Sequence, residues 1–322
     1  MLKARIAANL KKAATLTQLR ILILSLPLFS IPVITRDYYI MGVLILANVY
    51  AVFASSWDLL FLTGQASFGH AIFFGVAAYS VGILTRDFGL PPLATIPAGI
   101  ILAVITSILV GVPCLRLKGM YLTLLTFVLV IILNKTVYTF RVQLGGEEGI
   151  PGIPPLFRDR TYEYSLIMLI AVITLIIVFT VAKSKAGIIF KAISDNEDAA
   201  EAAGIDTPKY KILAFCLSAF FAGLAGGLYA YNRRHVGPDS LNVMTSFMAV
   251  MYCIFGGVGT IYGPFVGAYC LIIISELLRF TVFLRLLLYS VIFIICALYL
   301  PRGVAPPLIS GVKKIWERLK EG

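Results

Sequence analysis

Long uncharged, apolar runs separated by short polar breaks dominate this chain. The runs cover residues 38–57, 59–85, 88–115, 164–182, 212–232 and 240–275. A membrane-spanning helix needs about 20 consecutive apolar residues, so each run is long enough to cross a bilayer. The pattern therefore predicts an all-α, polytopic membrane protein.

The run at 240–275 is too long for one helix, and a cluster of glycines within 256–263 divides it in two. Shorter runs at 21–35, 119–134 and 286–301 reach spanning length when flanking side chains extend to the membrane surface. We therefore expect about ten transmembrane helices. They lie at 21–35, 38–62, 66–84, 92–112, 119–140, 164–182, 212–231, 243–256, 264–280 and 284–300.

Composition supports a membrane location, because hydrophobic residues make up 60% of the chain and charged residues only 13%. Soluble domains carry about 25% charged residues. Under the ten-helix count, seventeen of the 27 basic residues fall on one side of the membrane. They lie in residues 1–20, at Arg116 and Lys118, in the loop 183–211 and in residues 301–322.

Positively charged segments stay in the cytoplasm, so we expect both termini and the loop 183–211 to be cytoplasmic. Residues 141–163 and 232–242 are then external. The chain divides into a basic lead-in at 1–20, a permease domain at 21–300 and a tail at 301–322. The net charge of +11 indicates attraction to anionic membrane lipid rather than nucleic-acid binding.

The loop 183–211 contains a short polar, alanine-rich segment. Ser194 and Glu197 have the spacing of a capping box, in which a hydroxyl and a carboxylate each bind a free helix amide. Gly204 stands where a left-handed helix end is easiest. We therefore expect a short helix from about 195 to 203.

Thr207 and Pro208 predict the cap and the first residue of the following helix. The short helix at 195–203 carries alanines at 199, 200, 202 and 203, which leave it thin and smooth. Such a helix can enter a cleft on another protein. A soluble partner that pushes or gates the membrane domain is the expected consequence.

Two glycine-rich breaks precede predicted helices, at 64–79 and 256–269. Broken helix ends near a transport pathway expose backbone amides to the substrate, whereas small residues in membrane helices often serve close packing. Ser67 and His70 are three residues apart and would share a helix face, so we expect them beside the solute route. The candidate route also includes Asp58, Gly257 and Gly259.

Asp58, Lys135 and Glu276 are ionisable side chains within or beside predicted spans, where a charge costs a few kcal/mol and a functional role is the default. The alternative is local pairing, with amides for Asp58 and with Arg279 for Glu276. A functional role leaves open a second class of protein, an ion-coupled carrier or channel. In that case the alanine-rich helix would be an ordinary loop.

The sequence contains no recognisable catalytic chemistry. The five cysteines, at 114, 216, 253, 270 and 296, lie mostly within predicted spans and have no metal-ligand spacing. Walker loops, nucleophile elbows and clustered acid pairs are absent from the sequence. We expect a non-catalytic subunit without a cofactor or metal.

Five stretches, in order along the chain, carry a resemblance to a known family. They are residues 64–79, 117–126, 145–150, 187–230 and 255–264. Through them the chain resembles the LivM-type permease subunits of ABC importers for branched-chain amino acids. The resemblance implies a fold similar to the vitamin-B12-type and ribose-type importer permeases, and a location in the inner (plasma) membrane of a prokaryote.

The resemblance also implies four partner subunits: a LivH-type permease, two ABC ATPases and an external substrate-binding protein. The importer coupling loop maps onto residues 198–200 followed by Gly204, with Asp198 where glutamate is usual. The ATPase-coupling residues expected on this basis are Ser194, Asp195, Asn196, Glu197, Asp198, Ala199, Ala200 and Gly204. The implied function is inward, ATP-driven transport of branched-chain or other apolar amino acids by alternating access. Urea and short amides remain open as substrates, because related permeases carry them.

Overall fold

The computed structural model describes residues 37–115, 117–260 and 262–277, together with scattered positions between 287 and 307. Eight of the ten expected spans correspond to helices in this part of the chain. These helices are α3 (Tyr38–Phe61), α4 (His70–Phe88), α5 (Pro92–Cys114), α6 (Met120–Thr139), α8 (Arg160–Lys183), α11 (Thr207–Arg233), α12 (Val243–Gly256) and α13 (Gly263–Leu277). The expected span at 21–35, the lead-in at 1–20, and most of 284–300 and of the tail lie outside the described residues.

Six of these eight helices, all except α12 and α13, are long and apolar enough to cross a membrane. The glycine-rich turn does divide the long apolar run, but the two helices that result have 14 and 15 described residues. The protein is therefore an all-α polytopic membrane protein in its described part. The smaller elements are α7 (Arg141–Leu144), β1 (Ile150–Pro151), α9 (Lys185–Asp195), α10 (Glu197–Ala202), β2 (His235–Val236) and η1 (Pro238–Leu241).

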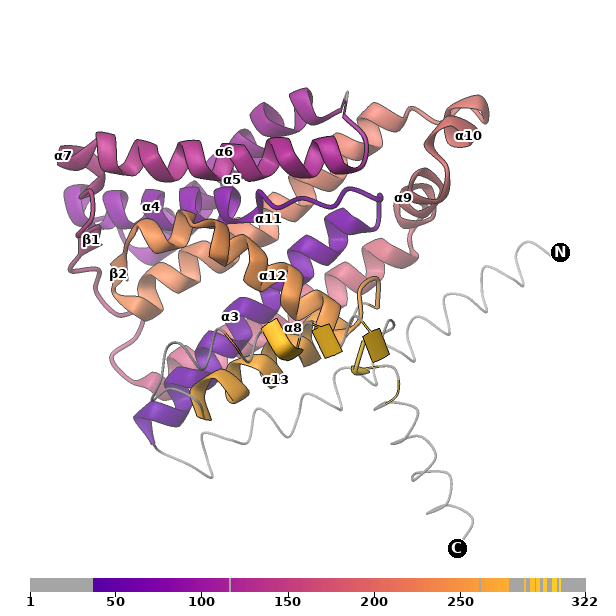
Figure 1. The fold of residues 1–322 in the computed structure, drawn as a ribbon. Helices are drawn as coiled ribbons and strands as arrows, with labels where there is room; N and C mark the ends of the chain where they lie inside the picture. Colours follow the sequence, from indigo (N-terminus) through magenta and orange to yellow (C-terminus); the bar gives the residue numbers. More distant parts are fainter. Residues whose placement is uncertain are drawn as a thin grey trace, which may run out of the picture.

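Helix α11 lies at the centre of the bundle and packs against α3, α4 and α5 (Figure 1). Small residues make this packing possible. A Cβ atom at Gly226 would lie 2.0 Å from the backbone oxygen of Phe74, and one at Gly223 would lie 2.8 Å from Cβ of Ala103. The close approach of helices through these glycines explains the small residues of α11 as packing positions.

Helices α5 and α6 leave much of their apolar surface uncovered by this subunit. Leu109 of α5 is 69% exposed and Tyr121 of α6 is 67% exposed. Apolar side chains on a membrane protein face lipid or neighbouring subunits, so this surface agrees with a membrane environment.

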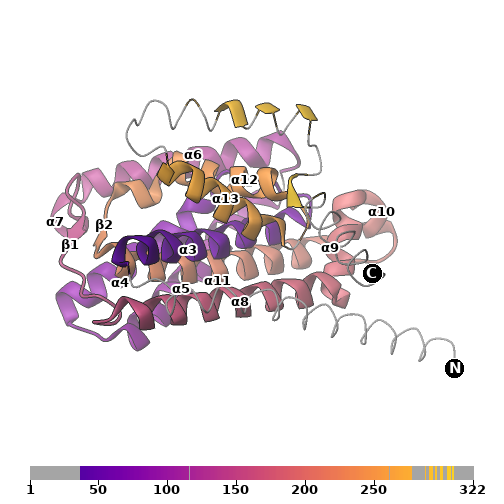
Figure 2. The same ribbon diagram turned by 90° about the horizontal axis from the view of Figure 1, so that it is seen from below.

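The two ends of the bundle carry different elements (Figures 1 and 2). Strands β1 and β2 pair in antiparallel fashion, with Ile150 opposite Val236, and thus join the segments 141–163 and 232–242 at one end. Helices α9 and α10 lie at the opposite end. This arrangement agrees with the expected separation of the two segments from the loop 183–211, whereas the side of the membrane on which each lies stays a prediction.

Candidate functional site

The polar segment 183–211 folds into two short helices rather than one. Helix α9 continues to Asp195, and Asn196 caps α10 by accepting a hydrogen bond from the Ala199 amide at 3.0 Å. The predicted capping box of Ser194 and Glu197 is therefore wrong, because Ser194 lies in the last turn of α9. Asparagine is as strong a cap as serine, and the Glu197 carboxylate binds elsewhere.

Gly204 ends α10 as expected, with a left-handed backbone at φ +83°. The Gly204 amide donates to the Glu201 carbonyl at 2.9 Å and the Ile205 amide donates to the Ala200 carbonyl at 3.1 Å. These two bonds form a Schellman motif. Helix α11 then begins with Asp206 as its cap, one residue before the predicted Thr207.

Two acidic side chains of α10 connect it to the start of α11. Glu197 forms an ion pair with Lys211, whose side chain is only 4% exposed. The Thr207 hydroxyl donates to Glu201 Oε1 at 2.6 Å. Hydrogen bonds with a charged partner are stronger than neutral ones, so these contacts fix α10 against the central helix.

A further ion pair joins α10 to the turn between α5 and α6. Lys118 Nζ lies 2.7 Å from Asp198 Oδ1, and both side chains are largely exposed. The ion pair lowers the pKa of Asp198 and raises the pKa of Lys118, through their hydrogen bond and mutual attraction. The sequence placed Lys118 on the same side of the membrane as this loop, but nothing in it indicated the pair.

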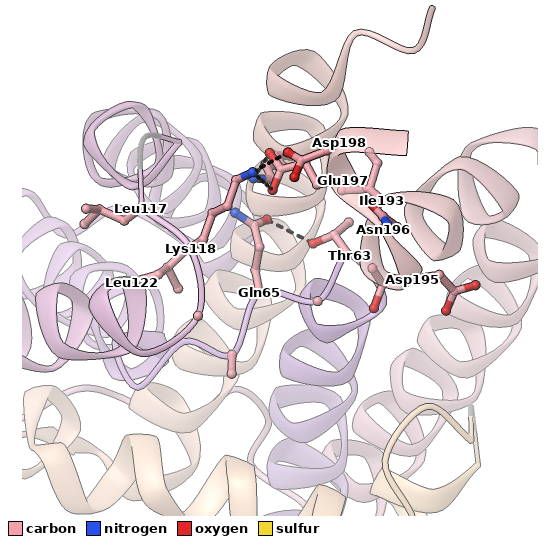
Figure 3. A pocket seen from close by; sticks show the side chains of 15 residues that line it. Thr63, Gln65, Leu117, Lys118, Leu122, Ile193, Asp195, Asn196, Glu197 and Asp198 are labelled. Atoms are coloured by element: carbon pink, nitrogen blue, oxygen red, sulfur yellow. Dashed lines mark hydrogen bonds and ion pairs between the residues drawn. The ribbon is translucent and has the colours of Figure 1, made fainter. Parts of the chain in front are cut away.

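A cavity of about 270 Å³ lies between these segments (Figure 3), lined by residues 63–66, 117–119, Leu122, 193–198 and Lys211. The Gln65 side chain is buried in its wall, where Oε1 accepts a hydrogen bond from Thr63 at 2.9 Å. Gln65 Nε2 has no hydrogen-bond partner among the described residues. Gly64 of the α3–α4 loop still approaches the predicted coupling segment, residues 194–204, beside this cavity: a Cβ atom at Gly64 would lie 3.2 Å from Cα of Ser194.

The eight predicted coupling residues lie together at this end of the bundle. Most of their side chains, including those of Asp195, Asp198 and Ala199, are exposed, whereas Ala200 is buried. An exposed, capped helix that is tied to the central helix can both meet a soluble protein and move the bundle.

The first glycine break has a different structure from the one expected. Ser67 precedes α4, which begins at His70, so the two residues do not share a helix face. Ser67 Oγ accepts from the Gly69 amide at 3.0 Å, and Ser246 Oγ accepts from the Ala71 amide at 2.9 Å. Side chains of the same subunit thus already bind amides that were expected to be free for solute.

His70 is completely buried between α3, α4 and α11. Its Nε2 atom lies 2.8 Å from Ser56 Oγ and 3.1 Å from Ser218 Oγ, while its ring contacts Phe53 and Phe73. The histidine therefore joins three helices in this conformation. Its place on a solute route stays a prediction.

Asp58, Gly257 and Gly259 come together although they are far apart in sequence. Asp58 is buried, and its Oδ1 atom accepts a hydrogen bond from the Gly259 amide at 2.7 Å. Gly257 and Gly259 have φ values of +118° and +71°, which explains the glycines in this turn. For Asp58 this geometry agrees with the alternative of pairing with a backbone amide, although that amide comes from the distant α12–α13 turn.

The other ionisable groups also have partners. Glu276 accepts a hydrogen bond from the Tyr39 hydroxyl, while Arg279 lies outside the described residues. Lys135 is exposed, with its ammonium group 5.4 Å from the ring centre of Tyr138. Neither contact indicates an ion-coupling site.

Residues 39–298 match the protein family described as branched-chain amino acid transport system / permease component. A curated relative is the high-affinity branched-chain amino acid transport system permease protein LivM of Escherichia coli (strain K12), 26% identical over 279 residues. That alignment covers 76% of this chain and 64% of the relative, so the chain spans less than two thirds of the relative's length.

Two other relatives carry related names. The probable branched-chain amino acid transport permease protein LivH of Methanocaldococcus jannaschii is 23% identical, with 87% of this chain and 93% of the relative covered. The autoinducer 2 import system permease protein LsrC of Yersinia enterocolitica is 27% identical, with 76% of this chain and 71% of the relative covered. No solved structure matches the chain.

Proposed function

Because this chain belongs to the permease family of branched-chain amino acid transport systems, we propose that it is a membrane subunit of an ATP-driven importer. It would move branched-chain or other apolar amino acids inward by alternating access. The observation that supports this proposal best is α10, a capped, exposed helix joined to the central helix of the bundle.

The proposed mechanism starts at the ATPases on the cytoplasmic side of the membrane. ATP binding draws two partner ATPases together, and one of them carries α10 with it. The Schellman end at Gly204 and the capped start at Asp206 keep α10 and α11 as separate rigid elements. Because Glu197 and Glu201 bind side chains at the start of α11, the movement of α10 reaches α11 and the helices packed on it, α3, α4 and α5, which changes access to the pathway.

The partners and the location follow from the same proposal. A LivH-type permease would cover part of the exposed apolar surface, and an external binding protein would deliver the solute and provide most of the specificity. We propose that α10 and both termini face the cytoplasm of a prokaryote and that the complete subunit has about ten spans. A fold like the vitamin-B12-type and ribose-type permeases is part of this proposal.

Reconstitution in proteoliposomes tests the function. The subunit is co-purified with its partner permease, ATPases and binding protein, and uptake of labelled leucine, isoleucine and valine is measured with ATP inside or outside the vesicle. Unlabelled urea, acetamide and autoinducer 2 serve as competitors. The proposal predicts uptake that requires ATP on the α10 side and is blocked by apolar amino acids. Uptake that needs only an ion gradient would instead support an ion-coupled carrier.

A further inference from the structure

Glu197 differs from its neighbours in α10 because its side chain turns toward the membrane helices. The side chain is 17% exposed, whereas that of Asp198 is 82% exposed. Its carboxylate binds Lys211 and lies 3.9 Å from Lys118 Nζ. A side chain in this position is not available to a protein that docks on the exposed face of α10.

Lys211 lies in the second turn of α11, the helix at the centre of the bundle. Because its side chain is 4% exposed, the ammonium group depends on Glu197 for a charged partner. Lys209 is two residues earlier on the same helix and is exposed. The two lysines therefore have the same charge and nearly the same position but different surroundings.

The surroundings of α10 differ between its two ion pairs, and a cavity lies beside them. This cavity borders the coupling segment and the loops at 63–66 and 117–119. The exposed Lys118–Asp198 pair can break and re-form in water at little cost. The Glu197–Lys211 pair is the more buried of the two, and separating it would leave a charge without a partner.

We propose that Glu197 is a positioning residue that transmits the movement of α10 to α11 through Lys211, and that it does not contact the ATPase. This inference rests on the proposed function, since it needs an ATPase seated on α10. It assigns different roles to two adjacent acidic residues of the coupling segment. Glu197 binds Lys211 of the membrane helix α11, whereas Asp198 lies at the surface.

The test compares Lys211→Met with Lys209→Met in the reconstituted complex, measuring both uptake and ATP hydrolysis per assembled complex. Lys211→Met should lower the amount of solute moved per ATP about tenfold or more. The ion pair that joins α10 to α11 is then missing, and the partly buried Glu197 loses this partner. Lys209→Met should keep the wild-type ratio. ATP hydrolysis should persist in both variants.

Two double variants separate transmission from simple stability. The neutral pair Glu197→Gln with Lys211→Met removes the unpaired charge, so assembly should recover while the transport ratio stays low. The exchanged pair Glu197→Lys with Lys211→Glu should recover part of the transport ratio. If Lys211→Met does not assemble, the neutral pair alone decides the question.

A neutral pair with the wild-type ratio of transport to hydrolysis would overturn the inference, because the ion pair would then serve folding only. Normal coupling in Lys211→Met would do the same. The proposed function fails in a different way, namely if the wild-type complex shows no ATP-dependent uptake. The two failures are therefore distinguishable in one set of preparations.

Discussion

Substitution of Gly204 perturbs the coupling segment through the backbone alone. The residue has φ +83°, and a Cβ atom built there would meet no other atom within 4 Å. A Cβ atom therefore causes no clash within the described part of the subunit, and the left-handed backbone is the main cost of replacing this glycine. Substitutions at Gly204 can therefore be compared by the free energy that each residue needs to adopt φ +83°.

The left-handed conformation costs a residue with a Cβ atom about 1–2 kcal/mol, and asparagine tolerates it better than most residues. A cost of about 1.4 kcal/mol corresponds to a tenfold change in population. Gly204→Ala should thus reduce the population of the Schellman end roughly tenfold, and Gly204→Val should reduce it further, because a β-branched residue is an outlier at positive φ. Gly204→Asn should be the mildest change.

The assay measures uptake and ATP hydrolysis in the reconstituted complex, with membrane insertion and subunit assembly followed by co-purification. Uptake per ATP should fall in the order Gly, Asn, Ala, Val, while insertion and assembly stay at wild-type levels. Normal ATP-driven uptake by Gly204→Val would show that the left-handed end of α10 is not needed for coupling. Equal loss in the Asn and Val variants would contradict the backbone explanation, which requires them to differ.

Further predictions concern topology and the buried polar contacts. Single cysteines introduced at 159 and 196 in a cysteine-free chain should react with an impermeant thiol reagent from opposite sides, and reaction from the same side would contradict the span count. Asp58→Leu should destabilise the subunit by about 1–3 kcal/mol in unfolding measurements, because it leaves the Gly259 amide unpaired in a buried site, whereas Asp58→Asn keeps an acceptor and should cost less. His70→Leu should reduce uptake per complex if His70 belongs to the solute route, and loss of assembly alone would identify a structural role.

The helices could be predicted from the sequence because the bilayer imposes one dominant pattern, a long apolar run. The predicted spans at 92–112 and 243–256 agree closely with α5 and α12. Helix starts were less predictable: α4 begins at His70, not at residue 66, and the side chains of Ser67 and Ser246 bind the amides of Gly69 and Ala71 at this start. Contacts between distant segments decide such boundaries, and the local pattern does not contain them.

The coupling segment illustrates the same limit. The end of α10 at Gly204 was predictable, because one residue and its backbone conformation determine it. The cap of α10 was not, since Ser194 and Asn196 are both good caps and the local pattern does not choose between them. The partners of Glu197 were also hidden, because Lys211 and Lys118 reach it from segments that the sequence does not place in contact.

The proposed mechanism depends on contact between α10 and an ATPase, and thiol cross-linking can detect that contact. Ala199→Cys, an exposed position on α10, is introduced into a cysteine-free chain, with Glu147→Cys at the opposite end of the bundle as the control. Each complex is treated with a short bifunctional reagent and analysed for products that contain an ATPase subunit. We expect an ATPase cross-link from position 199 and none from position 147. Absence of a cross-link from position 199 in an assembled, transporting complex would contradict the proposed mechanism.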